Sequence, residues 1–322
     1  MMNFRTLTPL QIGSFSAAVA VTLFSINDTA IKFLSGGYPL HEIVLIRSFL
    51  GLVLICVLIA PLTDGFAIMR TKRLPLHLLR GLFVVIANML FFLGLAAMPL
   101  ADAVAIFFVS PLVITVFSVI FLGETVGPRR WTAILVGFIG VVVMMRPGTD
   151  AFQFASLFPL VAAVSYAGLH MLTSVIGRTE SAATMVFYIQ ITFILVCVFV
   201  GLTVGDGRFG NQTHPPLEFL LRAWVWPNPA DFPVMMLLGV GVGIGGYFIS
   251  QAYRVAPAAV VAPYEYLALP LSVLWGVIVF DEWPDAVAFF GMALILGAGL
   301  FTVWREGKLG AEPPVPNPRV RR

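Results

Sequence analysis

Charged side chains are scarce in this sequence. Asp, Glu, Lys and Arg together make up 11% of its 322 residues, whereas hydrophobic residues make up 59%. Soluble domains carry about a quarter charged residues, and they need that polar surface to cover their core. The composition therefore excludes an ordinary soluble protein and predicts a chain whose surface faces the lipid bilayer.

Cysteine is scarce too, and no motif for catalysis is present. Cys56 and Cys197 lie in long apolar runs without a partner at metal-ligand or redox spacing, which excludes a disulfide framework and a zinc site. His41-Glu42 lacks the second histidine of a zinc protease motif, and no G-x-S-x-G nucleophile occurs. The sequence thus predicts no metal, no cofactor and no enzyme activity.

A strongly basic face is also missing. The formal net charge is only +3, and the Lys and Arg residues occur in short loops and in the tail rather than on one clustered surface. Nucleic acid is therefore not expected as a partner.

Long apolar segments are what the sequence has in abundance. A membrane-spanning helix needs about 20 mainly apolar residues, and short connections with Gly or Pro separate such segments here. The predicted helices cover residues 12–34, 39–60, 75–97, 101–122, 128–146, 154–176, 183–204, 233–253, 258–280 and 286–304. The predicted fold class is an all-α membrane protein of about ten transmembrane helices.

The positive charges are distributed unevenly over the predicted loops. With the N-terminus inside, thirteen Lys and Arg residues lie in cytoplasmic loops and tails and three lie in outer loops, as the positive-inside rule requires. Both termini are therefore predicted to be cytoplasmic. Residues 1–11 form a short N-terminal segment, and residues 305–322 form a disordered basic tail beside the membrane.

The second half of the sequence repeats the first. When the sequence is aligned with itself at a shift of 158 residues, identical residues match in the same order. A shift of 141 residues does the same for the predicted second and seventh helices. The matched pairs are Gly81 with Gly239, Ile86 with Ile244, Pro99 with Pro257, Ala101 with Ala259, Glu124 with Glu282, and Cys56 with Cys197. The predicted repeats cover residues 12–148 and 154–304. Because five helices are an odd number, the second copy should be inverted, as in many secondary transporters.

Several short motifs are arranged along both halves. They are Lys32, Arg47, Leu79-Arg80-Gly81, Ser110-Pro111-Leu112 and Leu122-Gly123-Glu124, with Pro270 and Asp281-Glu282 in the second half. In these residues the sequence resembles the EamA-domain branch of the drug/metabolite transporter superfamily. Asn27-Asp28-Thr29 and Ala262-Pro263-Tyr264-Glu265-Tyr266-Leu267 look most similar to its subgroup of S-adenosylmethionine and riboflavin uptake proteins. Asp281 departs from the family, which usually has Gly there. The resemblance implies transport through a central cavity between the repeats, but no particular substrate.

Three charged residues fall inside the predicted membrane segments near the outer side. Asp28 and Lys32 are spaced i and i+4, so they share one helix face, and Arg47 lies at similar depth in the next helix. Charges at this depth are expensive and usually functional. We expect Asp28, Lys32 and Arg47 to form one coupled cluster, acting either as a structural ion pair network or as a gate or substrate contact.

Glu265 is the sharpest single candidate for a binding or coupling group. It lies about seven residues into the predicted ninth helix, where the first repeat has the apolar Ile106 or Phe107. A carboxylate at this depth has to be paired, hydrated or protonated, and Tyr264 and Tyr266 offer hydroxyls and ring faces suited to a cation. We expect these residues to line a cavity; a purely structural network is the alternative.

Further polar residues lie at depths where they could complete the site. His170, Tyr247 and Gln251 match the depth of Glu265, although simple packing is the competing interpretation for His170. Asn88 lies near the middle of the third helix and would face the cavity that the family resemblance implies. An interhelical hydrogen bond is the alternative for Asn88.

Two classes of function are compatible with these features. The first is a secondary transporter that moves a small organic metabolite, cationic or aromatic, across the plasma membrane of a bacterium by alternating access, with a coupled proton as an option. The second is a non-transporting membrane receptor or a membrane-embedded enzyme. The whole-chain repeat and the missing catalytic motifs favour transport. Homodimer formation stays open.

The charge distribution makes a direct prediction about topology. Fusion of a reporter enzyme that is active only in the cytoplasm should give activity at both termini. A C-terminal fusion that is active only on the outer side would contradict this topology.

Overall fold

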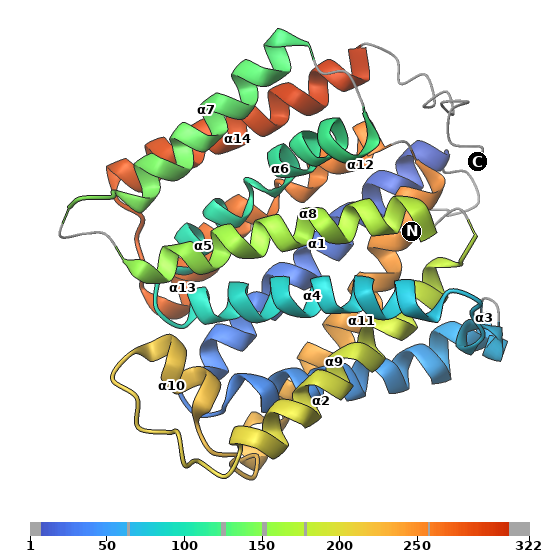
Figure 1. Cartoon of the computed structure of the whole chain (residues 1–322), viewed down its shortest axis with the longest axis vertical. Helices are drawn as coiled ribbons and strands as arrows, with labels where there is room; N and C mark the ends of the chain where they lie inside the picture. Colours follow the sequence, from blue (N-terminus) through green and yellow to red (C-terminus); the bar gives the residue numbers. More distant parts are fainter. Residues whose placement is uncertain are drawn as a thin grey trace.

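The computed structural model describes residues 8–62, 65–123, 127–149, 153–176, 179–256 and 258–308, and every regular element in these ranges is helical (Figure 1). Ten of the helical stretches are long and apolar enough to cross a membrane, which confirms the ten predicted segments. The predicted N-terminal segment and basic tail fall largely outside the described residues.

The spanning helices follow one another with short connections. They are α1 (Pro9–Leu34), α2 (Leu40–Leu54) with its continuation through Ile55–Ile59 into α3 (Ala60–Leu62), α4 (Leu74–Leu95), α5 (Leu100–Phe107) with α6 (Ser110–Phe117), α7 (Pro128–Met145), α8 (Leu157–Ile176), α9 (Ala182–Val204), α11 (Phe232–Val255), α12 (Ala258–Glu265) with α13 (Ala268–Phe280), and α14 (Ala286–Lys308). The short α10 (Pro215–Leu221) lies in the loop between α9 and α11.

The fourth and ninth spans are each interrupted, whereas the sequence predicted continuous helices there. The first break lies between α5 and α6 and the second between α12 and α13. Pro111 follows the first break and Pro270 the second. A proline lacks the N–H for a helical hydrogen bond and clashes with the carbonyl four residues earlier. The prolines therefore account for both breaks.

The helix boundaries recur along the chain at constant offsets. α4, α5, α6 and α7 begin at Leu74, Leu100, Ser110 and Pro128, and α11, α12, α13 and α14 each begin 158 residues later. The end of α1 and the start of α2 recur 142 residues later as the end of α8 and the start of α9. Such offsets support a five-helix repeat; the opposite orientation of the two copies stays a prediction.

Asp281, where the family usually has Gly, ends its helix in the same way as the matching residue of the first half. Asp281 has a φ of 56° and ends α13 in the left-handed conformation, and Gly123 has a φ of 69° at the matching place in the first half. Glycine adopts this conformation without strain, and Asp is one of the few other residues that visits it regularly. The chain keeps the turn geometry although the glycine is missing.

The helices pack in pairs that join the two halves of the chain. α1 packs against α11, α4 against α8, and α2 against α9 and α11. α7 and α14 lie side by side along one edge of the bundle (Figure 1). Close approach of α2 to α11 depends on Gly239, because a Cβ atom there would lie 2.3 Å from the Cβ of Leu50. The interior of the bundle is thus built from both halves.

Candidate functional site

The bundle has two ends with different polar contacts. We call the end with residues 35–39, 96–99, 146–149, 205–231 and 281–285 the long-loop end, and the opposite end, where the described chain begins and ends, the termini end. In Figure 1, α10 lies at the long-loop end at the lower left, and α3 lies at the termini end at the right.

The loop between α9 and α11 is folded onto the long-loop end. Tyr38 donates a hydrogen bond to Asp231 (2.5 Å) and accepts one from the backbone N–H of Asn228 (2.9 Å). The hydrogen bond to Asp231 raises the pKa of the Tyr38 hydroxyl. Arg222 donates to the carbonyl of Ser35 at 2.9 Å. The sequence assigned no role to this loop, and the structure shows that it joins α11 to the α1–α2 connection.

Lys32 lies at the same end, and its partner is Glu282 rather than Asp28. The Lys32 ammonium donates to both carboxylate oxygens of Glu282, at 2.6 and 2.8 Å, and to the carbonyl of Met98. Glu282 also accepts from the backbone N–H of Leu100, the first residue of α5. The predicted pairing of Lys32 with Asp28 is therefore wrong, because the α13–α14 turn brings a carboxylate to the end of α1.

A second ion pair joins the halves at the edge of this end. Arg146 donates to both carboxylate oxygens of Asp285, at 2.5 and 2.6 Å. This hydrogen bonding lowers the pKa of Asp285 and raises that of Arg146. The Asp285 side chain is 55% exposed, so the pair contributes little to stability.

Arg47 is placed deep in the bundle, close to Asn27 and Asp28. Its side chain is 3% exposed, and its guanidinium lies over the rings of Phe92 and Phe193, 5.3 and 5.1 Å from their centres. Nη1 of Arg47 donates to Asn27 Oδ1 at 3.3 Å, while the Asn27 amide donates to the carbonyl of Leu238. Of the three residues predicted to form one cluster, Asp28 and Arg47 interact electrostatically. Lys32 is not part of this cluster, because it is bound to Glu282.

A row of aromatic rings leads from Arg47 to His170. It runs through Phe92, Phe91, Phe107 and Tyr166, with neighbouring ring centres 5.1 to 5.7 Å apart. The ring of Tyr166 meets the ring of His170 edge to face at 4.6 Å. Nε2 of His170 is buried and has no hydrogen-bond partner among the described residues. The row connects polar groups of α2 with those of α8 across the interior.

Glu265 is the last residue of α12 and lies next to the same row. Its carboxylate interacts electrostatically with Tyr166 of α8, and its side chain is half-buried. Tyr166 contacts the ring of His170 and interacts electrostatically with Glu265; a network that joins Glu265 and His170 stays a prediction. Sequence reasoning did not find Tyr166, because a tyrosine in an apolar helix resembles an ordinary packing residue.

The two tyrosines beside Glu265 pack in different surroundings. Tyr264 packs against Ala17, Ala252 and Val261. The ring of Tyr266 is buried against Phe108 at 5.3 Å. The Tyr266 hydroxyl packs tightly against Gly299 of α14, because any Cβ atom at position 299 would overlap with the hydroxyl oxygen. That Tyr264 or Tyr266 lines a cavity with Glu265 stays a prediction.

Asn88, Tyr247 and Gln251 are placed in three different ways. Asn88 donates to the carbonyl of Val84 in its own helix at 3.1 Å, one turn from Phe92 on the same helix face. Tyr247 packs toward α2 and α9 in the cluster that contains Ile55. Gln251 is half-buried in α11. Neither Tyr247 nor Gln251 makes a described contact with Glu265.

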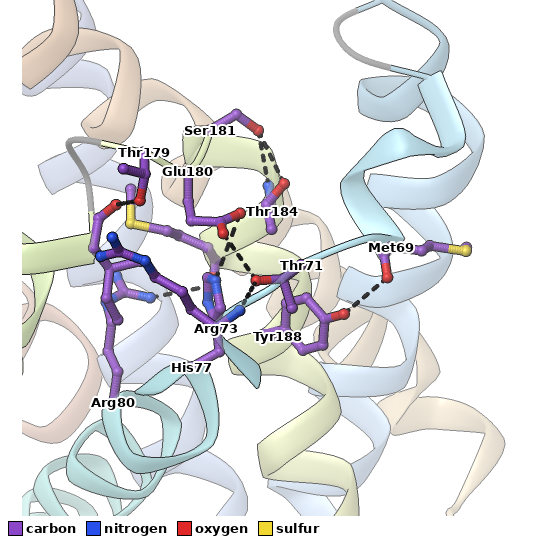
Figure 2. A network of polar contacts seen from close by, with 12 residues as sticks. Met69, Thr71, Arg73, His77, Arg80, Thr179, Glu180, Ser181, Thr184 and Tyr188 are labelled. Atoms are coloured by element: carbon purple, nitrogen blue, oxygen red, sulfur yellow. Dashed lines mark hydrogen bonds and ion pairs between the residues drawn. The ribbon is translucent and has the colours of Figure 1, made fainter. Parts of the chain in front are cut away.

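At the termini end, Glu180 joins the two halves (Figure 2). It accepts a hydrogen bond from Thr71 at 2.9 Å and lies 3.8 Å from Nε2 of His77. Tyr188 donates to the carbonyl of Met69 at 2.8 Å. These contacts tie the α8–α9 loop and the start of α9 to the segment before α4.

Arg80 strengthens this end from inside the bundle. Its Nε donates to Thr173 at 2.8 Å and its Nη1 to the carbonyl of Met185 at 3.2 Å, and the side chain belongs to α4 (Figure 2). Glu180 and the role of Arg80 were not predicted, because both depend on contacts across about a hundred residues. The importance of Glu282 could have been predicted from the sequence, because Glu282 belongs to one of the motifs and is matched with Glu124 of the first half.

Comparison with known proteins identifies similar chains. Residues 11–146 match the model of the EamA-like transporter family. The riboflavin transporter of Vibrio cholerae is 30% identical over 93% of this chain and 95% of its own. The S-adenosylmethionine uptake transporter of Rickettsia prowazekii is 28% identical over 88% of this chain and 90% of its own.

Two further comparisons extend this result. The pseudopaline exporter CntI of Pseudomonas aeruginosa is 27% identical over 90% of this chain and 95% of its own. A solved crystal structure that is 19% identical superposes with a TM-score of 0.62 over 94% of this chain and 99% of its own. The latter similarity concerns the fold alone.

The ion pair of Lys32 and Glu282 predicts a measurable coupling. Lys32→Gln and Glu282→Gln should each lower the melting temperature of the purified protein, because each leaves one charge behind at a site that is mostly buried. The double variant should lose less free energy of unfolding than the two single variants lose together, and the difference should be about 1–3 kcal/mol. Additive losses would contradict direct pairing. Asp28→Asn with Lys32→Gln is the matched pair that should be additive.

Proposed function

The chain belongs to the EamA-like transporter family and is a multi-pass membrane transporter of small metabolites, not an enzyme; from this premise we propose that it works by alternating access. The observation that carries the proposal is the placement of the polar contacts. Residues of the first half contact residues of the second half at both ends, by Lys32 with Glu282 and by Thr71 with Glu180.

In this proposal the two ends act as alternate gates. The long-loop end opens when Glu282 releases Lys32 and the amide of Leu100, and the termini end opens when Glu180 releases Thr71. Each gate consists of a few polar contacts, with one ion pair at the long-loop end, so its opening costs an amount that a bound substrate can offset. The predicted repeats and their inversion would give the gates equivalent roles at opposite membrane surfaces.

The substrate is proposed to lie between the gates, along the aromatic row. Asp28 and Arg47 lie at one end of this row, and His170, Tyr166 and Glu265 lie at the other. Aromatic faces suit planar or cationic groups. The named relatives carry organic metabolites in both directions, by uptake and by export. We propose a small organic metabolite with such groups as the substrate and the bacterial inner membrane as the location, with both termini cytoplasmic.

Glu265 is proposed to bind a cationic part of the substrate or to carry a coupled proton. In vesicles containing the purified protein, Glu265→Gln should reduce uptake of S-adenosylmethionine or riboflavin at least about tenfold, or abolish its dependence on pH, while the protein stays folded. Gln keeps the volume and most hydrogen bonds but removes the charge.

Asp206→Asn is the matched control, because this carboxylate lies in a loop and its side chain is 59% exposed. Its uptake should equal that of the unaltered protein. Unchanged uptake and an unchanged pH profile in Glu265→Gln would assign Glu265 to the scaffold. Absence of uptake and efflux of both compounds by the unaltered protein would contradict their choice as substrates.

A further inference from the structure

Arg47 is a buried cation whose position is fixed but whose charge is not neutralised by contact. The rings of Phe92 and Phe193 hold its guanidinium, and the single hydrogen bond to Asn27 is long, at 3.3 Å. Nε of Arg47 is buried and donates to no atom of the described residues. No carboxylate of the described chain forms an ion pair with it. A guanidinium presents five donors, so most of its binding capacity is unused.

Asp28 is the carboxylate that interacts electrostatically with this cation. It directly follows Asn27, the residue that contacts Arg47, and the two charges attract one another. Its half-buried carboxylate nevertheless forms no hydrogen bond or ion pair within the described part of the chain. Lys32, one helical turn away, is already bound to Glu282. The scaffold thus holds a carboxylate and a guanidinium within electrostatic reach, and no hydrogen bond or ion pair joins them among the described residues.

A further polar group packs against α2 one helical turn from Arg47. The amide of Gln190 in α9 is fully buried, and neither its oxygen nor its nitrogen has a hydrogen-bond partner in the ranges described. It lies against Gly51, one turn from Arg47 in α2, where a Cβ atom would lie 2.5 Å from Nε2. An unpartnered buried amide costs free energy. A ligand that accepts from this amide and from Arg47 would remove that cost.

The charges select the class of ligand. A cation bound to Asp28 alone would place a second positive charge near Arg47, and an anion bound to Arg47 alone would place a second negative charge near Asp28. In a low-dielectric interior either arrangement is strongly unfavourable. A group that carries one charge of each sign satisfies both residues and leaves the net charge of the site unchanged.

We propose that Asp28 and Arg47 bind a zwitterionic head group, an ammonium and a carboxylate on one carbon as in an α-amino acid. The ammonium contacts Asp28. The carboxylate contacts Arg47 and takes the place of the weak contact to Asn27, with the Gln190 amide as a further donor. This inference rests on the proposed transport function and specifies which part of a substrate is recognised at the α1–α2 side of the interior.

The test uses purified full-length protein and a matched set of ligands. S-adenosylmethionine and each of the proteinogenic amino acids are first screened for thermal stabilisation, because a ligand raises apparent stability by mass action. The compound with the largest shift is then compared with its methyl ester, which lacks the carboxylate charge, and its N-acetyl derivative, which lacks the ammonium. The unaltered protein should bind the zwitterion at least about tenfold more tightly than either derivative.

Two variants distinguish recognition from a structural role. Arg47→Gln should lose the preference over the methyl ester but keep that over the N-acetyl derivative, and Asp28→Asn should show the reverse. Arg208→Gln and Asp206→Asn remove the same charges from an exposed loop and should keep both preferences. A structural role would weaken all three ligands equally.

The double variant Asp28→Asn with Arg47→Gln guards against single variants that fail to fold, since it leaves no unpaired charge. It should bind the three forms with equal affinity, and a retained preference for the zwitterion would overturn the inference. No stabilisation by any zwitterion, or equal binding of the three forms by the unaltered protein, would overturn it as well. Riboflavin transport without a preference for zwitterions would contradict this inference alone and leave the transport function standing.

Discussion

A charged group in the hydrocarbon region has to find its partner inside the protein, and in this bundle the partner usually comes from the other half of the chain. Lys32 near the end of α1 is bound by Glu282, 250 residues later. Arg80 of α4 is bound by Thr173 and by the carbonyl of Met185. The contacts that hold Lys32 and Arg80 therefore also join the two halves of the chain, and the opening of either end has to break contacts of this kind.

The interruptions of the fourth and ninth spans place irregular backbone between these contacts. The two breaks face each other, since the rings of Phe108 and Tyr266 meet at 5.3 Å. Irregular backbone at membrane depth is tolerated only where protein or a polar cavity surrounds it. Glu265 ends the helix before the second break, at the offset of 158 residues that places Phe107 before the first. The matching position of the first half, Phe107, is apolar, so the charge at Glu265 is found in the second half alone.

Much of the fold could be predicted from the sequence, because hydropathy and helix length are local properties. All ten spans were located, and the matching of Glu124 with Glu282 gave the offset that the helix starts follow. The partner of Lys32 could not be predicted, since the spacing to Asp28 is local and the contact to Glu282 is not. Tyr264 or Tyr266 was expected to line a cavity with Glu265, and which of the two rings packs where could not be predicted: Tyr264 packs with Ala17 and Ala252, and Tyr266 packs against Phe108. Asn88 satisfies its amide within its own helix, which no sequence pattern reveals.

The central claim is that the contacts at the two ends are alternatives, so weakening one should favour the other. Spin labels at positions 36 and 283 would report the long-loop end, and labels at positions 72 and 179 the termini end, all of them exposed. Glu282→Gln should lengthen the distance between the labels at the long-loop end and shift the distances between the labels at the termini end toward shorter values. The reason is that the variant destabilises the state in which the long-loop end is closed, so its population falls. Unchanged distances at both ends, or lengthening at both ends together, would contradict alternating access through these contacts.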